Sequence, residues 1–161
     1  MSPLSTVDEL KAALADLVSA RVIGFSRTVN IAEVGFARGE VETWLHAQCP
    51  FRVTRGESTW FGTVDTAYPA TADADPAEAY RKNETMFDKR ARQVSERFQS
   101  VEYVVETATL GRAGTITLEL TGAVVIEVFP ACGGPIEQWR LFDRGSDVHY
   151  VFPDAAVIGD H

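Results

Sequence analysis

The chain contains 161 residues, of which 45% are hydrophobic and 24% charged, and its formal net charge is -8. This composition is typical of a globular protein and excludes wholesale disorder, and the length predicts a single domain over residues 1–161. The acidic balance disfavours nonspecific nucleic-acid binding and attraction to anionic membranes, because both depend on Lys and Arg. No apolar run approaches the roughly 20 residues of a membrane span, and residues 1–8 lack a signal-peptide pattern.

The first 63 residues predict one helix followed by a series of strands. Apolar residues at helical spacing, preceded by Ser5-x-x-Asp8 and Thr6-x-x-Glu9 capping pairs, predict a helix over residues 6–19. Pro50 is expected to end or bend one strand, because proline cannot donate to a ladder. The β-rich runs are residues 21–27, 28–36, 40–48, 51–54 and 58–63.

The middle of the chain predicts a loop and then a long helix. Residues 65–76 are rich in Ala, Thr, Asp and Pro and predict an exposed loop, and a second helix is predicted over residues 76–99, with Pro76 in its first turn. Basic residues on this helix alternate with acidic ones, as in the pairs Glu78 with Lys82 and Asp88 with Arg92. Mixed charges at this spacing indicate a solvated helix face rather than a nucleic-acid site.

The last third of the chain predicts five more strands, over residues 101–110, 115–120, 123–129, 136–142 and 148–152. In residues 115–121, Ile116, Leu118 and Leu120 alternate with polar residues, which predicts one face on a core and one in water. Short glycine-containing loops favour hairpins. With two helices for roughly ten strands, we expect an α+β fold built on a predominantly antiparallel sheet.

No motif predicts a metal, a cofactor or a catalytic residue. His46-x-x-Cys49 is a single local pair, whereas a zinc site needs three or four ligands. The chain has no G-x-S-x-G nucleophile motif and no glycine-rich phosphate loop. Enzyme activity is left open and is less favoured than binding. With only two cysteines, we expect a cytoplasmic protein in which Cys49 and Cys132 are free, mostly buried thiols.

The most suggestive residues lie in the final two predicted strands. They include an aromatic, a guanidinium, a carboxylate and an imidazole group. In one interpretation, Arg140 pairs with a carboxylate while Trp139 packs in the core. In the other, Trp139 anchors a partner or ligand and Arg140 clamps an anion. The candidate binding residues are Trp44, His46, Glu137, Trp139, Arg140 and His149.

The segments Trp44-Leu45-His46 and Phe51-Arg52, and Glu137-x-Trp139-Arg140 followed by His149, resemble those of small uncharacterised bacterial domains, including immunity-protein-like families. The resemblance implies a binding protein without a reaction of its own. We therefore expect recognition of a protein partner in an immunity-like or regulatory role. The alternative is a small-molecule or enzyme domain with a pocket near Trp44, His46, Trp139, Arg140 and His149. Because many strands leave sheet faces and edges to protect, we also expect a homodimer.

Overall fold

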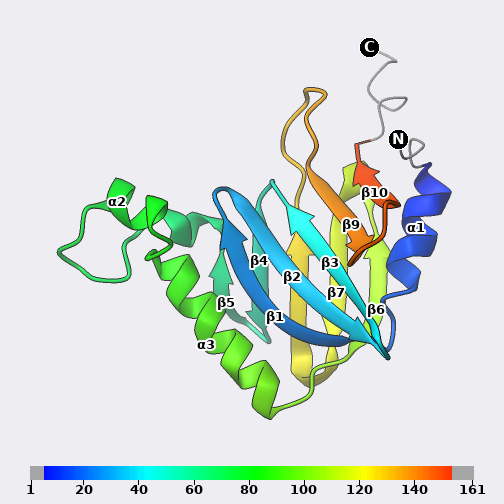
Figure 1. Ribbon diagram of the computed structural model, residues 1–161, viewed down its shortest axis with the longest axis horizontal. Coiled ribbons are helices and arrows are strands. Elements are labelled where there is room, and N and C mark those ends of the chain that lie inside the picture. Colours follow the sequence, from blue (N-terminus) through cyan, green and yellow to red (C-terminus); the bar gives the residue numbers. More distant parts are fainter. Residues whose placement is uncertain (1–5, 154–161) are drawn as a thin grey trace.

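Two five-stranded antiparallel sheets form the framework of the computed structural model, which describes residues 6–153 (Figure 1). The predicted α+β class and its antiparallel sheets are confirmed. Sheet A has, in spatial order, β1 (Arg21–Thr28), β2 (Ile31–Arg38), β3 (Val41–Ala47), β9 (Trp139–Asp143) and β10 (His149–Phe152). Sheet B has, in spatial order, β5 (Ser58–Gly62), β4 (Phe51–Arg55), β8 (Val124–Val128), β7 (Ile116–Leu120) and β6 (Val105–Leu110).

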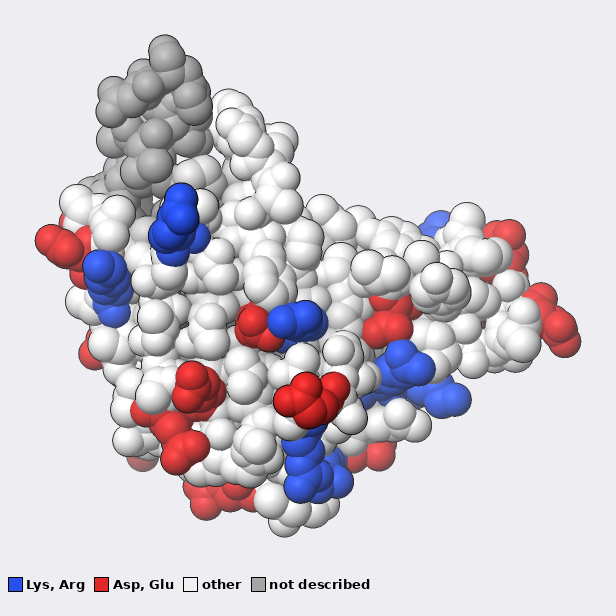
Figure 2. All heavy atoms as spheres, turned by 180° about the vertical axis from the view of Figure 1, so that it is seen from behind, with Lys and Arg blue, Asp and Glu red and all other residues white. Residues whose placement is uncertain are grey.

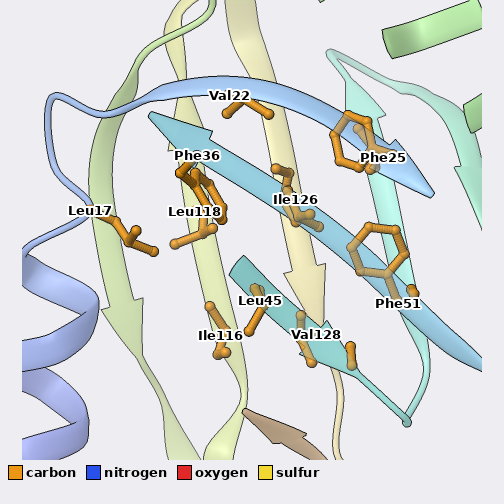
Figure 3. Close-up of a cluster of buried hydrophobic side chains, with 14 of the residues drawn as sticks. Leu17, Val22, Phe25, Phe36, Leu45, Phe51, Ile116, Leu118, Ile126 and Val128 are labelled. Atoms are coloured by element: carbon orange, nitrogen blue, oxygen red, sulfur yellow. The ribbon is translucent and has the colours of Figure 1, made fainter. Parts of the chain in front are cut away.

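The hydrophobic core lies between the two sheets (Figure 3). Alternate residues of each strand point into it, among them Phe36 and Leu45 from sheet A and Leu118 and Ile126 from sheet B, all fully buried. Most consecutive strands pair as hairpins, but the chain changes sheets between β3 and β4 and again between β8 and β9. Pro50 lies at the first of these crossings, where the ladder of β3 stops.

The helices cover the open sides of the sandwich rather than its faces. They are α1 (Val7–Ala15), α2 (Pro76–Arg81) and α3 (Met86–Ser100), with short 3-10 turns η1 (Thr63–Ala67), η2 (Arg112–Gly114) and η3 (Thr121–Ala123). Helix α3 packs against β1 and β5, and α1 packs against β6 and β10 (Figure 1). On the free edge of β1, the Phe25 N–H donates to Ser95 Oγ of α3 at 2.8 Å, so the helix satisfies an edge amide.

The predicted continuous helix over residues 76–99 is wrong, because the chain breaks between α2 and α3. Asn83 adopts a positive φ of 56°, and its side-chain amide donates to the Arg27 carbonyl at 2.9 Å. Thr85 and Asp88 then form a reciprocal capping box that starts α3. Within residues 6–153 no helix has the length and apolar character needed to cross a bilayer.

Several other predicted elements extend too far at one end, including the strand expected from residue 28, which begins at Ile31. The first helix was expected over residues 6–19 but ends at Ala15, because Ser19 has a φ of 76° and its N–H donates to the Val105 carbonyl. The strands expected from residues 101 and 136 begin at Val105 and Trp139. Near the two strand ends, backbone hydrogen bonds join distant segments, from Val22 N–H to the Tyr103 carbonyl and from Gln138 N–H to the Phe152 carbonyl, which local periodicity does not reveal.

A buried ion pair holds α3 to β1. The Arg27 guanidinium donates to both Asp88 oxygens, at 3.1 and 2.8 Å, and to the carbonyl oxygens of Tyr80 and Val29. Burial favours a higher pKa for Asp88, but the hydrogen bonds from Arg27 and Thr85 and the positive charge of Arg27 outweigh it and lower that pKa. The pair therefore needs both charged partners in place.

Candidate functional site

The outer face of sheet A brings together most of the candidate residues. Side chains alternate across each strand, so those of Trp44, His46, Arg140 and His149 all point away from the core. The register places His46 opposite both Glu33 of β2 and Arg140 of β9. We define this outer face by the outward residues of the five strands: Arg21, Gly24, Ser26, Thr28, Ile31, Glu33, Gly35, Ala37, Glu42, Trp44, His46, Arg140, Phe142, His149 and Val151.

Arg140 is the centre of a polar network on this face. It forms an ion pair with Glu137, in which Nε donates to Oε2 at 3.0 Å, and Nη1 lies 2.7 Å from His149 Nδ1. Because a guanidinium can only donate, Nδ1 of His149 accepts this hydrogen bond. Gln48 Nε2 donates to Glu137 Oε2 at 3.1 Å, and His46 Nε2 lies 3.3 Å from Glu33 Oε2. The Arg140 network therefore links β9 and β10 to the segments just after β3 and just before β9, and the His46–Glu33 contact joins β2 to β3 beside it.

Aromatic rings lie beside the network. Phe142 stacks on His149 with ring centroids 4.5 Å apart and meets His46 edge-on at 4.9 Å. Trp44 lies over Gly35, where an added Cβ would be only 2.9 Å from Trp44 Cη2. Gly35 thus leaves the space that the indole occupies, and Trp44 Nε1 donates to Glu42 Oε1 at 2.7 Å. These contacts preorganise the aromatic side chains of the face.

His46 is held in its neutral form. Burial is the main cause of its lowered pKa, and the positive charge of Arg140 acts in the same direction. Glu33 and Glu137 oppose the shift without reversing it. At neutral pH the contact between His46 and Glu33 is therefore a hydrogen bond more than an ion pair.

The residues around His46 form an open depression rather than a deep pocket. Its volume is about 410 Å³, and it lies on the sheet surface. It is lined by Ile31, His46, Gln48, Glu137, Arg140, Phe142 and His149. The polar groups are hydrogen-bonded to one another, and no Ser, Thr or Cys side chain lines the depression. Among residues 6–153, no group of three or more His, Cys, Asp and Glu side chains could hold a metal ion.

Trp139 lies on the opposite side of β9 from the other candidates. Its side chain is completely buried, its Nε1 donates to the Gly114 carbonyl at 2.8 Å, and its ring stacks on Phe152 at 5.9 Å. Gly114 has a φ of 77°, and an added Cβ there would overlap the Phe152 ring. The structure agrees with the first interpretation, in which Trp139 packs in the core and Arg140 pairs with a carboxylate.

The cysteine prediction is half right. Cys49 is buried beside the crossing from β3 to β4, and burial raises the pKa of its thiol to about 12. Cys132 is exposed in the connection between β8 and β9, so its expected burial is wrong. The reason is that Cys132 lies in an exposed stretch, residues 131–133, of the non-strand connection between the two sheets (Figure 1).

The outer face of sheet B has a different character. Its outward side chains on β4, β8, β7 and β6 are mainly threonines and charged residues: Arg52, Thr54, Val125, Glu127, Thr117, Glu119, Thr107 and Thr109. Figure 2 shows this side of the molecule, where basic and acidic side chains lie interspersed. This pattern is typical of a solvated sheet face. Trp44 and Phe142, by contrast, lie on the outer face of sheet A.

Three residues around His46 and Arg140 were not among the candidates: Glu33, Gln48 and Phe142. The alternation in residues 40–48 and 136–142 already placed Gln48 with His46 and Phe142 with Arg140, so period-two spacing was the signal for these two. Glu33 required the β2–β3 register. Comparison of the chain with protein-family models, curated proteins and solved structures found no match.

Proposed function

We propose that this protein is a non-enzymatic binding protein that recognises a protein partner through the outer face of sheet A. The observation that carries the proposal is the composition of this face. Trp44, Phe142 and two histidines lie partly exposed there beside Arg140, and the main helix contacts of sheet A are with its edge strands β1 and β10. Aromatic residues and Arg are enriched in protein interfaces, and an immunity-like or regulatory role is consistent with such a face.

The shape of the face favours a protein over a small molecule. Small-molecule sites are enclosed cavities with convergent polar groups, whereas the depression beside His46 is open. Arg140 and Glu137 already engage each other and their neighbours, so they offer few unsatisfied groups to a small ligand. A broad partner can instead cover the network and bury Trp44 and Phe142 together. The alternative, a ligand pocket among these residues, is thereby less favoured.

The charge of the chain favours a basic partner. The formal net charge is -8, and a strongly acidic protein attracts positively charged proteins over distances beyond direct contact. On the outer face of sheet A, Glu33, Glu42 and Glu137 supply carboxylates near the aromatic side chains. We therefore propose a partner with a positively charged surface.

Two matched aromatic truncations test the proposal. Trp44→Ala removes the largest side chain of the outer face of sheet A, and Tyr68→Ala removes an aromatic side chain that is 58% exposed outside that face. Immobilised wild-type protein captures binding proteins from native lysate, and mass spectrometry identifies them. Calorimetric titration of each purified candidate then measures its affinity for the wild type and both variants.

We expect Trp44→Ala to weaken binding of the true partner roughly thirtyfold, the scale of an interface hot spot, and Tyr68→Ala to leave the affinity unchanged. If Tyr68→Ala weakens binding while Trp44→Ala does not, the proposed face is wrong. A partner bound equally well by both variants and by the wild type would also contradict it.

A further inference from the structure

A second hollow lies at the end of the sandwich, between α1 and the β9–β10 hairpin. Its volume is about 180 Å³, and it is bounded by α1 on one side and by β3, β9 and β10 on the other. Behind its lining Leu17 and Leu141 are almost completely buried, at 1% and 2% exposure, and the accessible apolar surface comes from Val148 and Tyr150. None of the candidate binding residues lines this hollow, which shares only Phe142 with the depression beside His46.

The hydrogen-bonded carboxylate of Asp143 lies at the wall of the hollow. Thr43 is 3% exposed, and its hydroxyl donates to Asp143 Oδ1 at 2.6 Å. Arg38 Nη2 donates to the same oxygen at 3.2 Å, and Arg38 Nε approaches the Thr43 hydroxyl at 3.4 Å. Among the described residues, side chains engage only Oδ1 of Asp143, which leaves Oδ2 for a ligand.

The charges around the hollow favour a cation. Asp143 and the exposed Asp16 at the end of α1 both line it, against the single cation Arg38, so the local formal charge is negative. The Tyr150 side chain adds an aromatic ring to the lining, and the faces of aromatic rings attract cations. An anion would instead meet two carboxylates, and its best donor, Arg38, is already paired with Asp143.

We propose that this hollow binds an alkylammonium group, with the alkyl chain on Val148 and Tyr150 and the ammonium on Asp143. The ammonium donates to Asp143 Oδ2, and Asp16 adds a second negative charge at the mouth. A water molecule occupies about 30 Å³ in the liquid, so 180 Å³ has room for about six groups of that size. A four-carbon amine fits this space. The same chemistry occurs in free amines and in the lysine side chain of a basic protein.

The test is an NMR titration of the full chain with n-butylamine hydrochloride at neutral pH and constant ionic strength. Sodium butyrate, which has the same chain length and the opposite charge, is the ligand control. Asp143→Asn and Asp16→Asn each remove one carboxylate from the hollow, and Asp16 is exposed at a helix end, so its variant keeps the fold. Asp73→Asn makes the same change in an exposed loop remote in sequence from the hollow.

We expect saturable shifts in residues 13–17 and 141–150 with n-butylamine and none with butyrate. Asp143→Asn weakens binding about tenfold, as expected for the loss of one charge-assisted hydrogen bond, Asp16→Asn weakens it less, and Asp73→Asn has no effect. Absence of saturable shifts, equal binding of butyrate, or equal weakening by Asp73→Asn would overturn the proposal.

A parallel titration with Nα-acetyl-lysine amide distinguishes the two sources of the group. Equal binding of both amines identifies a lysine side chain as a fitting occupant, and binding of n-butylamine alone identifies a free amine. Either result supports the alkylammonium site, and neither depends on the outcome at the outer face of sheet A.

Discussion

Truncation of Trp139 tests the packing of the core most sharply. Trp139→Ala empties the largest fully buried side-chain site, removes the stacking on Phe152 and leaves the Gly114 carbonyl without its indole donor. Emptying a large aromatic site costs about 3–5 kcal/mol, and loss of a buried hydrogen bond places this variant in the middle or upper part of that range, at about 4 kcal/mol. With an m-value of about 2 kcal/mol/M, the urea midpoint falls by roughly 2 M.

Two companion variants separate the causes. Trp139→Phe keeps much of the buried ring but loses the bond to Gly114, and we expect it to cost about 1–3 kcal/mol. Trp44→Ala removes a partly exposed indole from the other side of sheet A, and we expect a cost of about 1 kcal/mol or less. Urea denaturation followed by circular dichroism measures all three. If Trp139→Ala unfolds at the wild-type midpoint, or no lower than Trp44→Ala, the packing account is wrong.

Four further predictions concern charge, pH, thiols and association. Arg27→Ala should destabilise the fold by about 3–5 kcal/mol, because it leaves the buried Asp88 carboxylate unpaired; a loss below 1 kcal/mol in the same urea assay would refute this. Since the pKa of His46 is lowered on folding, the unfolded state binds more protons, so stability should fall as the pH drops from the ordinary histidine pKa near 6.5 through the folded value. His46→Gln should remove that part of the pH dependence, and an unchanged profile would contradict it. A thiol reagent should label Cys132 rapidly and Cys49 only after unfolding; rapid native labelling of both would count against the buried position of Cys49. Sedimentation equilibrium at micromolar concentration should show a homodimer, and a single species of monomer mass at all salt concentrations would exclude it.

The strands were predictable where one face is buried and the other is wet. In β7, Ile116, Leu118 and Leu120 point into the core as their alternation required. The break between α2 and α3 was also encoded locally, in the Thr85-x-x-Asp88 capping box, but the long helical pattern hid it. Local signals of this kind identify which helices and strands form, but they place the ends of these elements less precisely.

The arrangement of the candidate site depended on pairings that local sequence does not specify. His46 and Arg140 are neighbours because β3 pairs with β9, although 93 residues separate them in the chain. That pairing follows from the two crossings between sheets, which only the packed core decides. The side of β9 on which Trp139 lies was likewise open, because both faces of residues 136–142 carry apolar side chains. In the structure, Trp139 is on the side of β9 that faces the core between the two sheets.

The proposed partner-binding face can be tested directly through the three tryptophans of the chain. Trp44 is on the outer face of sheet A, Trp60 lies beside α3 against Phe98, and Trp139 is buried, so the protein labelled with 5-fluorotryptophan should give three distinct fluorine resonances. Single Trp→Phe variants assign them. On addition of the purified partner, we predict that the Trp44 resonance shifts or broadens while those of Trp60 and Trp139 stay in place. A shift of Trp60 with Trp44 unchanged would place the partner elsewhere and contradict the proposed function of this face.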